Sequence, residues 1–525
     1  MSEPGNPEER QLIITTVTVS LGTVILFASW VLVAGDQAAA VAGALAELIN
    51  DGVGWLYVVI ATAFLALLLW LAVSRHGGLV LGGSDHTPEF STPSWLALLF
   101  CAGMGTGLLT WSSAAPLWQY LHPVDAEPGS LAAARTALVT AAFPFGLHGW
   151  AIYGLSAVAV ALGSAGAGRG LRPAVGIFDD GHAGLTGMVE IVATLAVLFG
   201  VGAALGAGVL QMDGALQRLR PWPLDAPWRY GLIVAAITLL FVLAAVGWRR
   251  GGIRLLSILT LAAMLLLLGF VLVVGTPLFD LKLFVDGVGR TLSNLPALSF
   301  HTDPFELAQQ DWSGDPTQAH FSGWIAWAPF VGVFVARISR GRTLRALVLG
   351  GLIAPALFSL FVFAVFGGTT LHLATLDGLD VAGPMLADPS LATLHLLRQL
   401  PLSELSGLLL VLLLWLFLVT SASAANVALA TATSSGGRDP GLAMIVLWAT
   451  ALTAFMALPL VPGGLAALRA ATVITALPCL GLLILMAGRT LVRMRGTERH
   501  TGVMAAATIQ LPAEKGAVAS GTESG

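Results

Sequence analysis

Residues 94–121 read SWLALLFCAGMGTGLLTWSSAAPLWQYL. This stretch is mostly apolar and holds no charged residue, and such stretches decide the fold of the chain. A helix needs about 20 apolar residues to cross the hydrocarbon of a bilayer. Comparable runs lie near residues 12–34, 53–73, 94–121, 132–162, 184–210, 229–247, 255–276, 318–337, 345–367, 405–433, 441–461 and 466–488. The sequence therefore predicts an all-α integral membrane protein with about twelve transmembrane helices.

The composition excludes several other classes of protein. Of 525 residues, 56% are hydrophobic and 10% are charged, whereas soluble domains carry about 25% charged residues. The formal net charge is -4, and no long basic block offers a surface for nucleic acid. Cys101 and Cys479 both lie in apolar runs, which gives no disulfide framework or metal cluster. The partners that we expect are the lipid bilayer and a small-molecule solute.

Charged residues predict the orientation of the chain. If the N-terminus is cytoplasmic, the segments on that side hold most of the arginine and lysine residues, including the run at 337–345. This bias predicts a multi-pass protein of the cell inner membrane with both termini in the cytoplasm. Between the seventh and eighth spans, apolar residues at helical spacing within 280–295 predict an amphipathic helix on the membrane surface. The polar tail after Arg499 predicts disorder.

Three glycines stand close together in the third span, at Gly103, Gly105 and Gly107. Each costs a helix about 1 kcal/mol relative to alanine. One hypothesis is a locally unwound helix whose carbonyls coordinate a cation or whose backbone contacts a ligand. The alternative is close packing of two helices through small residues. The residues alone leave both open.

Aromatic residues in the fourth and eighth spans form a second candidate group. Phe145, Trp150 and Tyr153 fall within about 140° of one helix circumference, and Trp324 and Trp327 are about 60° apart. Each set can face one cavity, where a desolvated ring binds a quaternary ammonium by a cation–π interaction of about 2 kcal/mol or more. An interfacial aromatic belt or ordinary core packing also explains these residues.

Hydroxyl side chains in the tenth span form a third candidate group. Thr420, Ser421 and Ser423 lie within four residues, and Asn426 follows one turn later. Their oxygens could complete a shell around Na⁺ together with backbone carbonyls of an unwound third span. Hydroxyls in membrane helices also donate to their own i-4 carbonyl or to a neighbouring helix, so this interpretation stays open too.

The ordered motifs of the chain resemble the betaine/carnitine/choline transporter family. The resemblance is carried by PEFS at 88–91, AGMGTGL at 102–108, HGWAIY at 148–153, WIAWAPFVG at 324–332 and ARISRGR at 336–342. It implies a leucine-transporter-like core of two inverted five-helix repeats, with the substrate between them. The implied organisation is an N-terminal tail at 1–11, two extra helices and a loop at 12–93, repeats at 94–276 and 318–488, an extracytoplasmic helix and loop at 277–317, and a largely disordered cytoplasmic tail at 489–525. The resemblance also implies a homotrimer.

By position, the resemblance implies the residues of two binding sites. The substrate would contact Phe145, Trp150, Tyr153, Trp324, Trp327, Gly103, Gly105 and Gly107. One Na⁺ would be held by the hydroxyls of Thr420 and Ser421 and by the backbone carbonyls of Cys101, Met104 and Phe417. The hydroxyl residues of a second sodium site in relatives fall at Val197 and Val201, which predicts that this second site is missing. A family glutamate, an aspartate near the sodium site and a cage-side tryptophan fall at Ala115, Ser423 and Gly323. The loss of the two buried acids implies a wider and less polar pocket.

The function implied by these residues is import of a quaternary ammonium compound or a related compatible solute. The resemblance implies coupling to about one Na⁺ and an alternating-access mechanism. Two alternatives stay open, namely a sodium-independent substrate/product exchanger and a transport-degenerate membrane sensor. An enzyme is not expected, because no nucleophile with a base and no metal-ligand set stands out within the spans.

Overall fold

The computed structural model describes residues 7–82, 87–123, 126–164, 170–178, 183–247, 251–301, 316–434 and 440–509. Within these ranges the long elements are all helices, and β pairing is limited to an isolated antiparallel bridge between Val80 and Thr343. Eleven of the described helices are long and apolar enough to cross a membrane, and one bent pair raises the number to 12. The prediction of an all-α membrane protein with about twelve spans is therefore confirmed.

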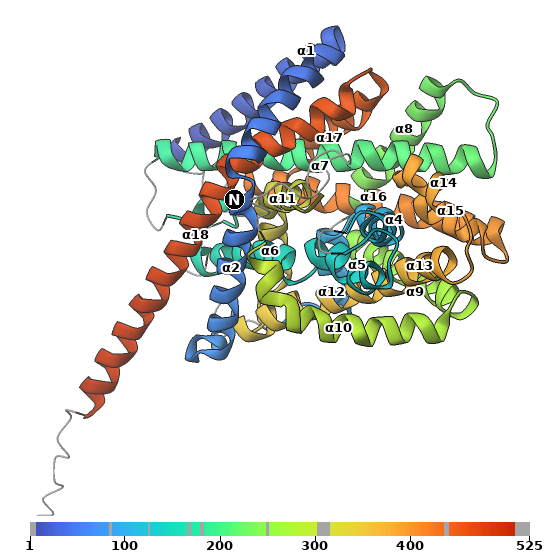
Figure 1. Ribbon diagram of the computed structural model, residues 1–525. Coiled ribbons are helices and arrows are strands. Elements are labelled where there is room, and N and C mark those ends of the chain that lie inside the picture. The colour runs from blue at the N-terminus through green and yellow to red at the C-terminus, as the bar shows by residue number, and fades with distance from the viewer. Residues whose placement is uncertain are drawn as a thin grey trace, which may run out of the picture.

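The helices are joined by connections of unequal length, the longer ones lying between α2 and α3, between α6 and α7, and between α10 and α11 (Figure 1). In chain order they are α1 Pro7–Val53, α2 Trp55–Val73, α3 Thr92–Gly103, α4 Gly107–Leu121, α5 Leu131–Ala142, α6 Leu147–Ser164, α7 Ala183–Leu219, α8 Ala226–Val246, α9 Gly252–Val274, α10 Pro277–Ser299, α11 Pro316–Ile338, α12 Leu344–Val362, α13 Gly368–Thr375, α14 Ala382–Ala387, α15 Ala392–Arg398, α16 Ser403–Ala432, α17 Leu442–Ala457 and α18 Gly464–Ile509. Every predicted span coincides with one of these helices or with a pair of consecutive helices.

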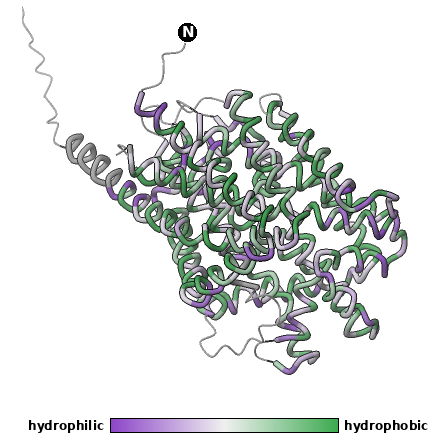
Figure 2. Tube along the Cα trace, turned by 90° about the horizontal axis from the view of Figure 1, so that it is seen from above, coloured by the Kyte–Doolittle hydropathy of each residue, from purple (hydrophilic) through white to green (hydrophobic). Residues whose placement is uncertain are grey.

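A helix at the periphery of the molecule, such as α2, has one apolar face buried against other helices and another apolar face exposed. Along α2, Phe64 and Leu68 are buried, whereas Leu69, Trp70 and Val73 are exposed. Such an outward apolar face is stable against lipid and would be costly in water. Figure 2 shows hydrophobic residues along most of the trace, including the helices at its periphery.

Helix α11 lies at the centre of the molecule. Its membrane-spanning part is 89% buried, compared with 33% for the corresponding part of α9. It packs against α6, α7, α16 and α18, so helices from both predicted repeats surround it. Side chains on α11 therefore face other helices rather than lipid.

Helix α10 confirms the helix predicted within residues 280–295, and it runs along the lower edge of the molecule in Figure 1. Its first turn is anchored by Asp280, which accepts hydrogen bonds from Thr276 Oγ1 at 2.9 Å and Thr369 Oγ1 at 3.0 Å. Burial raises the pKa of the Asp280 carboxyl to about 7. Its last turn is anchored by Ser299, whose hydroxyl lies 3.0 Å from His148 Nε2. Both ends of α10 are thus fixed to membrane-spanning segments.

The C-terminal tail differs from the prediction of a disordered segment from residue 489 onward. Helix α18 continues without interruption to Ile509. Residues such as Leu491, Met494 and Arg495 favour helix, and a chain that is already helical extends at little cost because the nucleus exists. Residues 510–525 of the predicted tail lie outside the described residues.

Candidate functional site

The glycine-rich segment interrupts the third span. Helix α3 ends at Gly103, α4 begins at Gly107, and the two axes are bent by 69°. Met104 has extended backbone angles, with φ -112° and ψ 127°. A helix end leaves carbonyl groups without intrahelical partners. The unwinding considered for these glycines is therefore present, and it makes backbone oxygens available at this point.

The same segment also approaches aromatic rings closely. A Cβ atom at Gly103 would lie 2.6 Å from Trp150 Cη2. At Gly105 the corresponding distance, to Trp327 Cη2, is 3.6 Å, which is an ordinary contact. Close packing through a small residue, the alternative considered for these glycines, therefore applies to Gly103 in addition to the break.

Three of the predicted aromatic residues touch one another, and we call Trp150, Tyr153 and Trp324 the aromatic triad. The ring centroids of Trp150 and Trp324 are 5.6 Å apart, those of Tyr153 and Trp324 4.6 Å, and those of Trp150 and Tyr153 5.9 Å. Trp150 is 1% exposed, Tyr153 is 4% exposed and Trp324 is 6% exposed. This burial rules out an interfacial belt for the triad.

Glycines on both helices bring α6 and α11 together around the triad. A Cβ atom at Gly149 would lie 2.6 Å from Trp324 Cε2, and one at Gly332 would lie 2.0 Å from Ser156 Oγ. Neither position has room for a larger residue. The indole Nε1 of Trp150 is buried and has no hydrogen-bond partner among the described residues. An unsatisfied buried donor is costly, so a ligand that accepts from this N–H would relieve the cost.

The other two predicted aromatic residues, Trp327 and Phe145, lie outside the triad. Trp327 lies next to Gly105 at the helix break and next to Gly200 of α7, where a Cβ atom would be 3.0 Å from Trp327 Cδ1. Phe145 stands in a separate group, with ring centroids 5.0 Å from His320 and 5.2 Å from Phe363.

We call this second group the His320 cluster, because His320 also lies 5.1 Å from the ring of Trp111. Sequence reasoning did not assign Trp111, His320 or Phe363 to a site. Trp111 follows Gly107 by four residues and so shares its face of α4, which is the signal that could have identified it. Nothing comparable marks Phe363, because its neighbours in the cluster are distant in the sequence.

The predicted sodium ligands meet where α16 passes the end of α3. The hydroxyl of Ser421 donates to the carbonyl of Cys101 at 3.5 Å, across a separation of 320 residues. The hydroxyl of Thr420 donates to the carbonyls of Leu416 at 2.6 Å and Phe417 at 3.1 Å. The i-4 bond considered for these hydroxyls is thus formed by Thr420, and both oxygens keep lone pairs that a cation can use.

The remaining predicted ligand, Met104, lies three residues after Cys101, at the point where α3 ends. Met104 is 2% exposed, so its backbone lies inside the protein. Val197 and Val201, where the resemblance implies that a second sodium site is missing, are buried in α7.

Polar contacts close the end of the bundle beyond α6. Arg493 of α18 donates to the carbonyl of Val175 at 2.7 Å and to that of Gly176 at 3.2 Å, while Glu190 of α7 accepts from the amide of Ala174 at 3.0 Å. Arg172, in the same segment, forms an ion pair with Glu9 of α1. These contacts tie the connection between α6 and α7 to the start of α7 and to α1 and α18, which are distant in the sequence.

Comparison with known proteins identifies a family that this chain matches. A family model described as BCCT, betaine/carnitine/choline family transporter, matches residues 15–499. A "Probable glycine betaine transporter" of Desulfitobacterium hafniense (strain Y51) is 31% identical over 482 residues, which cover 90% of this chain and 95% of the relative.

Two further relatives are similar at nearly the same level. An "Ectoine/hydroxyectoine transporter" of Virgibacillus pantothenticus is 32% identical over 82% of this chain and 87% of its own length. An osmo-dependent choline transporter of Acinetobacter baylyi is 32% identical over 88% of this chain and 68% of its own length. The three relatives thus carry the names of three different solutes at almost equal identity.

Proposed function

Because this chain belongs to the betaine/carnitine/choline transporter family, we propose that it imports a quaternary ammonium compound or a related compatible solute by alternating access, coupled to Na⁺. The resemblance drawn from the sequence motifs is confirmed by the family match over nearly the whole chain. The chain is accordingly a multi-pass membrane transporter and not an enzyme. The solute, the coupling ion, the inner-membrane location and the orientation are parts of the proposal.

The observation that carries the proposal is the contact between the helix break and the aromatic triad. The Cβ position of Gly103, the last residue of α3, faces the ring of Trp150. A broken helix beside buried rings offers two kinds of ligand in one place, since carbonyl oxygens suit a small cation and ring faces suit a large soft one. Neither kind requires a buried carboxylate, which would hold the solute at a large desolvation cost.

Two features support a solute that carries an acceptor group and extra bulk. The unpartnered Nε1–H of Trp150 can donate to a carboxylate or a similar oxygen on a zwitterionic solute. A Cβ atom at Gly323 would meet nothing within 4 Å, so α11 leaves open space one turn before Trp327. Betaine-like and ectoine-like compounds both meet the first requirement. The names of relatives do not choose between them, because three names occur at almost equal identity.

The contact between Ser421 and Cys101 supports coupling to Na⁺. Sodium bound there would bridge α16 and the interrupted third span, and so would favour one arrangement of the break. If that arrangement also binds solute more tightly, each ligand must raise the affinity for the other by the same factor. The valines at 197 and 201 support a single ion per solute.

The polar contacts around residues 170–178 support alternating access. Arg172 joins this segment to Glu9, and Arg493 joins it to α18. These contacts close one end of the bundle and would have to rearrange for solute to leave on that side. A transporter of this kind must switch between such closed and open ends around a fixed site.

Uptake of radiolabelled solute into proteoliposomes tests the proposal. Glycine betaine, choline, carnitine, ectoine and a sulfonium analogue would be compared with an inward Na⁺ gradient, with equal Na⁺ on both sides, and with K⁺ replacing Na⁺. We expect concentrative uptake of at least one solute only with the gradient. Counterflow that needs no Na⁺ would show that the protein is an exchanger rather than a symporter. Solute binding without any uptake would show that it is a sensor. The homotrimer stays a prediction, which the mass of the lipid-embedded complex would test.

A further inference from the structure

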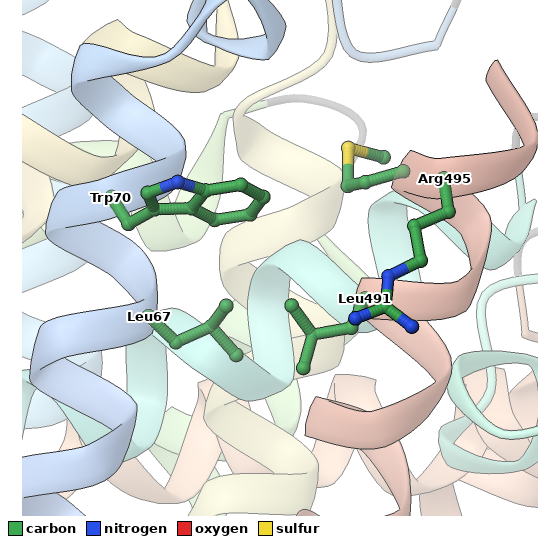
Figure 3. Close-up of a pocket in the computed structure, with 5 residues that line it drawn as sticks. Leu67, Trp70, Leu491 and Arg495 are labelled. Carbon is green, nitrogen blue, oxygen red and sulfur yellow. The ribbon is translucent and has the colours of Figure 1, made fainter. Parts of the chain in front are cut away.

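A cleft of about 260 Å³ lies between α2 and the C-terminal part of α18. None of the residues that line it belongs to the proposed transport site. Leu67 and Trp70 from α2 line one side, and Leu491, Met494 and Arg495 from α18 line the other. Figure 3 shows the indole of Trp70 and the guanidinium group of Arg495 facing the same space. In Figure 1 the two helices diverge here, because α18 leaves the bundle diagonally.

The cleft lies at the end of the membrane-spanning part of both helices. Helix α2 ends at Val73, and along α18 the apolar run at 466–488 gives way to Arg489, Arg493 and Arg495. The end of α2 is held by Arg345, which donates to the carbonyl of Ala72 at 2.7 Å. Arg345 belongs to the arginine-rich run that predicts the cytoplasmic face. The cleft is therefore placed at the headgroup level of the leaflet that is predicted to face the cytoplasm.

Arg495 and its neighbour Arg493 on α18 carry the same charge but differ in their hydrogen bonds. Arg493 donates to the carbonyl oxygens of Val175 and Gly176, so its guanidinium group serves the fold. Arg495 is exposed, lines the cleft, and has no hydrogen bond or ion pair recorded among the described residues. The cleft thus combines an apolar floor with one positive charge at its rim.

We propose that this cleft is a binding site for an anionic phospholipid. One acyl chain lies along Leu67, Leu491 and Met494, and the headgroup phosphate pairs with Arg495. The exposed ring of Trp70 lies at the interface beside the headgroup, where tryptophan is favoured. Basic pockets between membrane helices on the cytoplasmic side bind anionic headgroups in this way. The charge selects phosphatidylglycerol over phosphatidylcholine, whose headgroup carries no net charge.

Native mass spectrometry of the purified full-length chain tests this site. The protein is equilibrated with equal amounts of phosphatidylglycerol and phosphatidylcholine, and the lipids retained on it are counted. We expect wild-type protein to retain phosphatidylglycerol preferentially. We expect Arg495→Gln to lower its retention about fivefold, and Arg495→Lys to keep most of it. Leu67→Trp fills the cleft without changing charge and should also lower retention.

Arg10→Gln is the matched control, because Arg10 is an exposed arginine of α1 that does not line the cleft. It should leave lipid retention unchanged. The unfolding temperature of each variant is measured, so that loss of lipid is separated from loss of the fold. Equal retention of both lipids by the wild type, or unchanged retention by Arg495→Gln, would overturn the proposal. Displacement of the lipid by inorganic phosphate would overturn it as well, and so would a cleft that cross-linking shows to be covered by a second copy of the chain.

Discussion

The two spans that border the candidate site, the pair α3 and α4 on one side and α11 on the other, are built in opposite ways. The first is broken between Gly103 and Gly107 and bent by 69°. The second runs unbroken from Pro316 to Ile338, although Pro329 lies within it. In the predicted inverted repeats these spans are counterparts, the first helix of each repeat. Their sequences have nonetheless produced a bent backbone in one and a continuous helix that carries Trp324 and Trp327 in the other.

The difference teaches how one site can serve two ligands. The broken span offers backbone oxygens, because its helix end frees carbonyl groups from hydrogen bonding. The unbroken span offers rings at fixed positions, because a continuous helix sets the direction of Trp324 and of Trp327. We therefore expect changes on α11 to alter solute affinity most, and changes around the break to alter sodium dependence.

The largest effect is expected from Trp324→Ala on α11. This change removes a ring that contacts both Trp150 and Tyr153. The loss of one desolvated cation–π interaction, about 2 kcal/mol, weakens solute binding about 30-fold. Equilibrium binding of radiolabelled solute to the purified protein measures this change in the dissociation constant.

The matched control is Trp228→Ala, because Trp228 is 72% exposed at the start of α8. It should bind solute like the wild type. If Trp324→Ala retained wild-type affinity, the aromatic triad would be ordinary core packing and the ring-bearing role of α11 would be wrong.

The next largest effect concerns the broken span and its neighbour α16. Ser421→Ala removes the hydroxyl that reaches the carbonyl of Cys101. We expect the Na⁺ concentration for half-maximal uptake to rise about tenfold, since an interaction with a charged group contributes about 1.5 kcal/mol or more. Uptake measured over a range of Na⁺ concentrations provides the value.

Ser406→Ala is the control for the sodium measurement. The Ser406 hydroxyl donates to the carbonyls of Leu402 and Ser403 in the first turn of α16, about four turns before Ser421. Its sodium dependence should equal that of the wild type. Equal sodium dependence in Ser421→Ala as well would remove the proposed ion site from this junction.

A smaller effect is expected from Gly103→Ala at the end of α3. The new methyl group would lie 2.6 Å from the ring of Trp150, so the ring must shift. Overpacking of this kind costs about 1 kcal/mol or more, and we expect solute affinity to fall about fivefold. Gly105→Ala makes the same substitution two residues later, where the nearest ring atom is 3.6 Å away. Comparable losses in both variants would show that the triad does not depend on the close approach at Gly103.

The smallest effect is expected from Phe145→Leu. The ring of Phe145 contacts His320 and Phe363, and no ring contact with the aromatic triad is recorded for it. We expect solute affinity to change less than about threefold, because the volume is nearly kept and no triad contact is removed. A loss as large as that of Trp324→Ala would extend the solute site into the His320 cluster.

Local patterns predicted most of the architecture. A run of about 20 apolar residues commits a segment to a membrane helix wherever it packs, and the twelve predicted spans correspond to described helices. The glycines at 103–107 made a break one of two open interpretations, since their helix propensity is low at any position. The tail was the exception, because its helix continues from α18 through residues whose composition alone predicts disorder.

The sequence by itself thus determined the class of fold, the number of spans and the family, because hydropathy and ordered motifs are properties of contiguous residues. Only the tertiary structure decided that Trp150 and Tyr153 meet Trp324, that Phe145 joins His320, and that Ser421 reaches Cys101. These contacts depend on how each helix is rotated and where glycines let two helices approach. That arrangement is set by the packing of all the helices at once, which no single segment specifies.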